Sequence, residues 1–217
     1  MFRLSRFGIV LSFLSLMIPS GFAAASKTAQ PAKPPFLMAV EDAFSIAGRG
    51  SVVTGRVERG EVKVGQKVDV VGLGATQKAT VTTIEMLGKM PSSAKAGDSV
   101  GLVLQGVPVG NLKRGQVIAQ ENSIQARQSF TASIQLLDTA KGGPKYPLKN
   151  NYRPLVYLRS IDFNGSKLTL PKGMTELGAG AKATVTIELL ESAALEKGQQ
   201  FALREGGRTI GTGIVEK

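Results

Sequence analysis

The amino-acid sequence predicts an all-β protein made of two antiparallel β-barrels in tandem. Three observations support this prediction: short runs in which apolar and polar residues alternate, frequent glycine turns between them, and the lack of a long helical stripe of apolar residues. Hydrophobic residues make up 42% of the 217-residue chain, which is enough for packed cores. We place the two domains at residues 36–121 and 122–217, because residues 120–128 are polar and do not alternate.

The N-terminal segment, residues 1–25, is typical of a secretory signal peptide. Arg3 and Arg6 precede an apolar run over residues 7–18, and small residues at 23–25 suit a signal peptidase. We therefore expect an exported protein, periplasmic or secreted after cleavage. An uncleaved N-terminal anchor is the first alternative, although the run is shorter than the ~20 residues of a membrane-spanning helix. An organelle transit peptide is the second.

The first barrel follows a linker at residues 26–35 (SKTAQPAKPP), which is rich in Pro, Ala and Lys. Asp42, Phe44 and Ile46 alternate with small residues until a Gly-Arg-Gly turn reverses the chain. Residues 51–57 alternate again, the segment ERGE turns the chain back, and valine-rich runs continue the pattern. This succession of short strands and turns predicts a barrel over residues 36–121.

The second barrel, residues 122–217, shows the same period of two. Phe130, Ala132, Ile134 and Leu136 share one face of a predicted strand, and a second strand repeats the pattern around residues 185–189. Gly206 and Gly207 lie between two strand-like runs, and glycine tolerates the positive φ that a two-residue hairpin requires.

The composition excludes several classes of enzyme. The chain contains no cysteine, histidine or tryptophan, so it has no disulfide framework, no Ser-His-Asp triad, and no thiolate or imidazole for a metal. The glycine-rich string at 178–184 lacks the spacing of a phosphate loop. Glu41 and Asp42 have no base, metal cluster or nucleophile beside them, so a surface or binding role is favoured for them. Nothing in the sequence marks a pair of carboxylates that would flank a sugar, so a glycosidase-like enzyme is the least favoured class. We predict no catalytic residue, no metal site and no cofactor.

The formal charge of +11 is unevenly distributed. Residues 1–35 contribute +4, residues 36–121 contribute +2, and residues 122–217 contribute +5. A positive surface attracts phosphate or anionic lipid, although solubility alone is the simpler explanation. If the chain binds a polyanion, the second barrel is the expected place.

One long string and several short ones point to a known family. The long string covers residues 40–60 (VEDAFSIAGRGSVVTGRVERG), and the shorter ones are VKVG at 62–65, TIEM at 83–86, AGD at 96–98, KRGQV at 113–117, NYRP at 151–154 and FALREGGRTIG at 201–211. In this order they closely resemble the second and third domains of bacterial translation elongation factor Tu. The resemblance covers about residues 36 to 217 and implies two β-barrels packed as a unit.

That family also has a GTP-binding domain, whose motifs have no counterpart in this sequence. The resemblance therefore implies the fold without the enzyme, and we expect that this chain alone neither binds nor hydrolyses GTP.

The resemblance also implies binding residues. In the family, the second domain holds the terminal adenosine and the aminoacyl group of charged transfer RNA. The matching positions are Glu41, Asp42, Phe44, Ile46, Val52, Thr54 and Glu85, and Arg114 matches a residue that meets the 5′ phosphate. For the third domain, an RNA or partner surface is expected at Lys141, Lys145, Lys149, Glu205 and Gly206.

The sequence departs from the family's pattern at several of these places. Leu87 and Gly88 stand where the family usually has aromatic or histidine and basic residues, and Ser99 stands where it has asparagine. Pro144 and Lys145 replace a basic-histidine pair. Each matching residue also has a purely structural explanation, such as packing or a surface ion pair.

Two functions therefore remain open. The first is an exported, non-catalytic binding module whose partner is a protein or a polyanion. The alternative is a translation factor whose barrels bind the aminoacyl acceptor end of transfer RNA together with a separate GTP-binding chain.

Overall fold

The computed structural model describes residues 33–217. The predicted signal peptide and most of the predicted linker, residues 1–32, lie outside the described residues. The described part consists of β-strands with two short 3-10 turns, η1 (Val109–Asn111) and η2 (Thr139–Lys141). Between residues 33 and 217 there is no helix with the length and apolar character needed to cross a membrane.

The first barrel contains strands β1 to β9. Their bounds are Leu37–Ala39 (β1), Asp42–Ile46 (β2), Gly50–Arg59 (β3), Glu61–Lys63 (β4), Lys67–Val71 (β5), Gln77–Glu85 (β6), Ser93–Lys95 (β7), Ser99–Gln105 (β8) and Val117–Gln120 (β9). Six of them form a closed ring in the order β1-β9-β5-β6-β8-β3, because β1 also pairs with β3. Strand β2 extends the sheet from β3, and β4 pairs separately with β7.

Alternation explains how this ring fills its core. Four fully buried side chains from four different strands meet inside it: Val53, Ile84, Leu102 and Ile118. Gly55 lies where β3 passes closest to β1, and a Cβ atom there would stand 2.0 Å from the carbonyl oxygen of Ala39. The glycine thus permits the close approach of the two strands.

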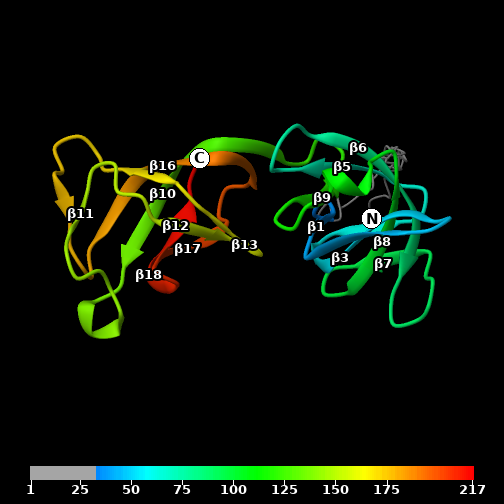
Figure 1. The fold of residues 1–217 in the computed structure, drawn as a ribbon, viewed down its shortest axis with the longest axis horizontal. Coiled ribbons are helices and arrows are strands. Elements are labelled where there is room, and N and C mark those ends of the chain that lie inside the picture. Colours follow the sequence, from blue (N-terminus) through cyan, green and yellow to red (C-terminus); the bar gives the residue numbers. More distant parts are fainter. Residues whose placement is uncertain (1–32) are drawn as a thin grey trace, which may run out of the picture. The chain divides into compact units, whose positions relative to one another are not determined.

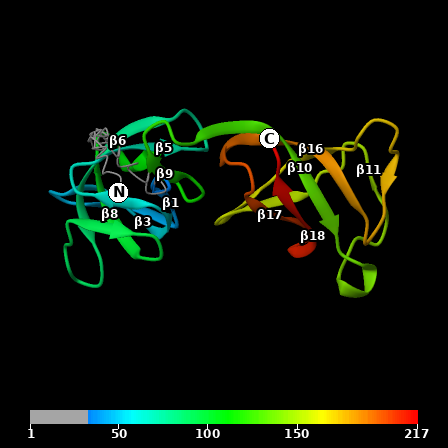
Figure 2. The same ribbon diagram turned by 180° about the vertical axis from the view of Figure 1, so that it is seen from behind.

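The second barrel contains strands β10 to β18. Their bounds are Gln125–Leu136 (β10), Leu148–Lys149 (β11), Leu155–Leu158 (β12), Ile161–Phe163 (β13), Lys167–Thr169 (β14), Glu176–Leu177 (β15), Lys182–Leu195 (β16), Gln200–Glu205 (β17) and Arg208–Val215 (β18). Seven of them form one antiparallel sheet in the order β13-β12-β17-β18-β10-β16-β14, and β11 pairs with β15. Strands β16, β10 and β18 lie side by side in both views (Figure 1 and Figure 2).

The tandem arrangement of two antiparallel barrels is confirmed, with one difference in the second. Its edge strands β13 and β14 do not pair with each other in the described sheet, so the sheet curls without closing into a hydrogen-bonded ring. Phe130 and Phe201 pack edge to face in its core, with ring centroids 5.6 Å apart. The predicted Gly206–Gly207 hairpin joins β17 to β18, and both glycines have positive φ.

The two barrels meet at a set of ion pairs around Arg159. Its side chain is only 8% exposed, and its guanidinium lies 3.2 Å from carboxylate oxygens of Glu58 and of Glu196. Arg59 binds the other oxygen of Glu196 at 2.7 Å. Burial raises the pKa of Glu58 above its ordinary value, although the charge of Arg159 opposes this shift. Residues from both barrels thus share one charge network.

Candidate binding pocket on the first barrel

A pocket of about 410 Å³ lies on the outer side of the first barrel. Four of the residues that the sequence predicts for RNA-end binding line it: Phe44, Val52, Thr54 and Glu85. The other lining residues belong to the turn before β3, the segment after β6, and β8, and they are Arg49, Met86, Leu87, Gly88, Lys89, Met90 and Gly101. We call this site the Phe44 pocket.

The strand register brings these side chains together. Phe44 on β2 stands opposite Val52 on β3, and Thr54 on β3 stands opposite Gly101 on β8. Gly101 in turn stands opposite Glu85 on β6. Side chains directly opposite each other in an antiparallel pair share a face, so four strands contribute to one surface. Because Gly101 has no side chain, Thr54 and Glu85 are left on either side of an open floor.

An ion pair defines the polar side of the pocket. A terminal nitrogen of Arg49 lies 2.7 Å from Oε1 of Glu85, and both side chains are partly exposed. A pair as exposed as this contributes little to stability. Its effect is to fix the direction of the Glu85 carboxylate, whose other oxygen is an acceptor for a ligand's hydroxyl or amino group.

A tight turn after β6 forms the apolar rim. Met86 and Lys89 exchange two backbone hydrogen bonds of 2.9 Å around Leu87 and Gly88, which have φ values of 49° and 74°. A leucine with positive φ is uncommon, and Leu87 is also 96% exposed. Met90 and Phe44 are exposed beside it, at 63% and 41%. Exposed apolar side chains gathered at one place are typical of a contact surface.

The remaining residues expected at the RNA-end site do not line this pocket. Glu41 is exposed, and its backbone amide bonds to the carbonyl of Thr54. The carboxylate of Asp42 accepts a 2.8 Å hydrogen bond from the amide of Ala43. Ile46 stands opposite Gly50, at the start of the turn.

Sequence reasoning missed three residues that shape the pocket. The sequence pattern places Arg49 only in a turn, although its ion pair with Glu85 spans 36 positions of the chain. No motif or alternation in the sequence identifies Gly101 or Met90 as a pocket residue. The only available signal was the place of Arg49 inside the longest matching string, one residue before β3 begins.

Arg114, expected to contact a phosphate, lies away from the Phe44 pocket. Its Nε donates a 2.8 Å hydrogen bond to the carbonyl of Ser160 on the second barrel. The side-chain hydroxyl of Ser160 donates in return to the carbonyl of Val40. Arg114 is exposed, and the Nε edge of its guanidinium is occupied by this hydrogen bond between the two barrels.

The residues expected at the second barrel's surface occupy two places. Lys141, Lys145 and Lys149 are exposed between β10 and the end of β11. Glu205 ends β17, accepts a hydrogen bond from the hydroxyl of Tyr152, and lies 3.5 Å from Arg208. Gly206 follows in the hairpin turn.

Glu205 is therefore held by neighbours in its own barrel. Burial of Tyr152 and its bond to Glu205 raise the pKa of the tyrosine hydroxyl, which stays a proton donor at ordinary pH. Over residues 33–217 there is also no group of three acidic, histidine or cysteine side chains placed to hold a metal ion.

The fold and the pocket together define a class: a tandem β-barrel module with a partly apolar surface pocket on its first barrel. Comparison with known families names the family. Residues 50–119 match elongation factor Tu domain 2, and residues 123–217 match the elongation factor Tu C-terminal domain. The chain belongs to the elongation factor Tu family through these two barrel domains, and the resemblance found in the sequence is confirmed.

Proposed function

We propose that the chain is an exported, non-catalytic binding module of the elongation factor Tu type, and that the Phe44 pocket is its binding site. The observation that carries this proposal is the convergence of Phe44, Val52, Thr54 and Glu85 on one pocket. Fold alone does not fix function, so the argument rests on this site.

The chemistry of the pocket suits the end group of a larger partner. Phe44 and Val52 form an apolar wall, and Glu85 and Thr54 supply polar atoms on the opposite side. A ligand with a flat or apolar body and a hydroxyl or amino edge would fill both sides. In small concave sites of this kind, a few well-placed polar groups fix the orientation of the ligand, and the apolar wall buries most of its surface.

The non-catalytic part of the proposal rests on the side chains that the chain contains. Without histidine or cysteine, the sequence offers neither the side chain most often used as a general base near neutral pH nor a thiolate nucleophile. Export rests on the leader-like pattern of residues 1–25. A protein or a polyanion is the expected partner, and GTP is not an expected ligand of this chain alone.

Fractionation of cells that express the C-terminally tagged chain tests export. We expect a species outside the cytoplasm whose N-terminus, read by mass spectrometry, lies near residue 26. A chain found only in the cytoplasm with its first 25 residues intact would contradict export. Retention of those residues on a membrane-bound species would instead indicate the uncleaved anchor.

Affinity capture from the same culture tests the pocket. The tagged chain is compared with Phe44→Ala, which removes the apolar wall, and with Leu190→Ala, which removes an exposed apolar side chain from the second barrel. A partner specific for the pocket is lost with the first variant and kept with the second. If both variants capture the same partners as the unchanged chain, the Phe44 pocket is not the binding site.

The alternative function is binding of the aminoacyl end of transfer RNA together with a separate GTP-binding chain. It is favoured by the same convergence, because the family resemblance assigns these pocket residues to that end. Filter binding with charged and uncharged transfer RNA at two salt concentrations separates the two functions. Preference for charged RNA that is lost in Glu85→Gln supports the alternative. Equal and steeply salt-dependent binding would indicate only phosphate attraction.

A further inference from the structure

A second, larger groove lies on the outer face of the second barrel, away from the Phe44 pocket. Its volume is about 620 Å³, and its lining comes from β10, β12, β16, β17 and β18 together with Arg159. The opposite face of the same strands carries Ile134, Phe201 and Leu203 into the core. The groove is therefore made by the side chains that this sheet does not bury.

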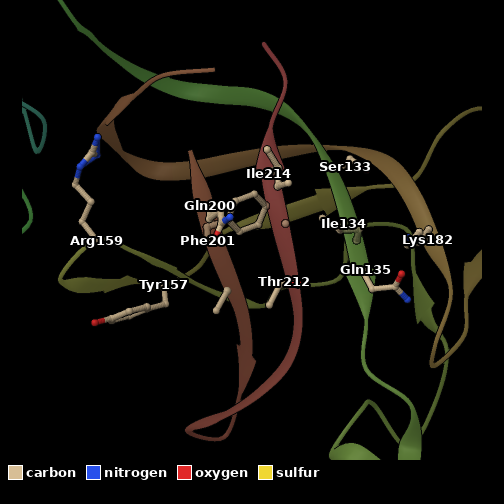
Figure 3. A pocket seen from close by; sticks show the side chains of 12 residues that line it. Ser133, Ile134, Gln135, Tyr157, Arg159, Lys182, Gln200, Phe201, Thr212 and Ile214 are labelled. Carbon is tan, nitrogen blue, oxygen red and sulfur yellow. The ribbon is translucent and has the colours of Figure 1, made fainter. Parts of the chain in front are cut away.

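Strand register orders these side chains into a straight row. Tyr157 stands opposite Ala202, Ala202 opposite Thr212, Thr212 opposite Gln135, and Gln135 opposite Lys182. Neighbouring strands lie about 4.8 Å apart, so the five positions span about 20 Å across the sheet. Figure 3 shows Tyr157 and Lys182 at opposite ends, with Thr212 and Gln135 between them.

A shorter row runs beside the first, two residues along each strand. Gln200 stands opposite Ile214, and Ile214 stands opposite Ser133. The middle of the groove thus presents amide and hydroxyl groups, each of which can both donate and accept hydrogen bonds. The side-chain nitrogen of Gln135 is already bonded to the carbonyl of Gly180 at 2.6 Å, which leaves its oxygen as the acceptor.

The two ends of the long row are different in character. Tyr157 is held under the guanidinium of Arg204, 5.3 Å from the ring centroid, and Arg204 is fixed by Asp162 at 2.9 Å. The aromatic end is therefore rigid. Lys182 at the other end is exposed. None of the twelve described residues that line the groove carries a carboxylate, and the charge of Arg159 is already matched by Glu58 and Glu196.

These properties select one class of ligand. Nucleic acid gains its affinity from many cations, whereas this groove offers one exposed ammonium group. A protein partner would be expected to meet a continuous apolar centre, whereas Ile214 is the large aliphatic side chain exposed here. A row of uncharged hydrogen-bonding groups between an aromatic ring and a cation matches a chain of hydroxyl groups with one acid.

We infer that this groove binds a short oligosaccharide that carries a carboxylate on at least one of its sugars. The sugar hydroxyls bond to Thr212, Gln135, Ser133 and Gln200, one sugar packs beside Tyr157, and the carboxylate pairs with Lys182. The site is separate from the Phe44 pocket, so it does not depend on the function proposed for that pocket.

The test uses the full chain and tetrasaccharides of galacturonate, mannuronate and glucuronate–N-acetylglucosamine, with cellotetraose as the neutral comparison. Binding is followed by amide shifts in NMR spectra at about millimolar ligand, where weak affinities are measurable. Lys182→Gln removes the charge, and Thr212→Val removes a hydroxyl while keeping a residue suited to a strand. Lys172→Gln, an exposed lysine of the same barrel outside the groove, is the matched control.

We expect at least one uronate tetrasaccharide to bind more tightly than cellotetraose and to shift the amides of β10 and β18. Lys182→Gln should weaken uronate binding about fivefold, as expected for one exposed charged contact, and leave cellotetraose unaffected. Thr212→Val should weaken both classes of sugar, whereas Lys172→Gln and Phe44→Ala should change neither. The last variant separates this site from the proposed function of the Phe44 pocket.

Three results would overturn the inference. The first is failure of all the uronate tetrasaccharides to bind. The second is binding that Lys182→Gln and Thr212→Val leave unchanged. The third is displacement of bound sugar from the groove by a short single-stranded RNA with steep salt dependence, which would identify the groove as a polyanion site.

Discussion

Replacement of Arg159 by methionine should destabilise the protein far more than removal of a surface charge. Arg159 is 8% exposed and faces Glu58 and Glu196, which are 38% and 35% exposed. The residue has a positive φ of 51°, and methionine is an unbranched residue like arginine, so the backbone strain changes little. The main effect is therefore the loss of the cation between two glutamates.

The expected loss in the free energy of unfolding lies between the values known for buried and for exposed ion pairs. Removing one partner of a fully buried ion pair costs about 3–5 kcal/mol, and exposed pairs contribute about 0–1 kcal/mol. Because the arginine is buried and both glutamates are about one-third exposed, we expect Arg159→Met to lower the free energy of unfolding by about 2–3 kcal/mol. The matched control is Lys167→Met, whose pair with Glu188 is exposed on both sides, and it should lose less than about 1 kcal/mol.

Urea unfolding followed by far-ultraviolet circular dichroism measures both variants. Adding Glu58→Gln to Arg159→Met should recover part of the loss, because it removes the carboxylate whose partner was Arg159, whereas Glu196 keeps its pair with Arg59. Equal losses for Arg159→Met and Lys167→Met would refute the reasoning, since the network would then behave as a surface feature. A double variant no more stable than Arg159→Met would show that carboxylate repulsion is not the cause.

Three further predictions concern pH, strand packing and the pocket. The folded-state pKa of Glu58 is raised above the ordinary 4.5, so the folded protein binds this proton at a higher pH than the unfolded chain does. Urea titrations should therefore show the wild type gaining stability relative to Glu58→Gln as the pH falls from 7 toward 4.5, and a constant difference in stability would contradict the shift. Gly55→Ala should cost about 3 kcal/mol or more by the same assay, because its Cβ would overlap the carbonyl of Ala39, whereas Gly178→Ala, with open space around it, should be nearly neutral. Gly101→Ala should keep the melting temperature within a few degrees, because the added Cβ meets its neighbours at ordinary contact distances of 3.7 to 4.0 Å, and it should weaken partner capture by filling the floor of the Phe44 pocket. Capture at the wild-type level would show that no ligand reaches this floor.

The fold was predictable because both barrels obey a period of two. Phe130, Ala132, Ile134 and Leu136 are all buried on one face of β10, as the alternation required. The open edge of the second sheet was not predictable, because β13 and β14 are three residues long and give no measurable alternation. Closure depends on which edges pair, and that information lies in the tertiary packing.

The site was predictable only in part, for a similar reason. Phe44 and Val52 were found because the matching string contains both of them, and they stand opposite each other in the β2–β3 pair. Ile46 follows the same alternation as Phe44, but the strand ends there and the turn carries the chain away. The contact between Arg49 and Glu85 joins two distant segments, so a pattern along the chain does not reveal it.

The place of β1 in the ring has a consequence for the order of folding. Leu37–Ala39 is the first of the described strands, yet it pairs with Val117–Gln120, the last strand of its barrel. A ribosome must therefore synthesise some eighty further residues after β1 before the ring can close. Contacts between such distant segments form slowly, because the intervening loop must lose its freedom first. Until residue 120 has emerged, the ring of the first barrel cannot close, and apolar residues that it later buries stay accessible to chaperones.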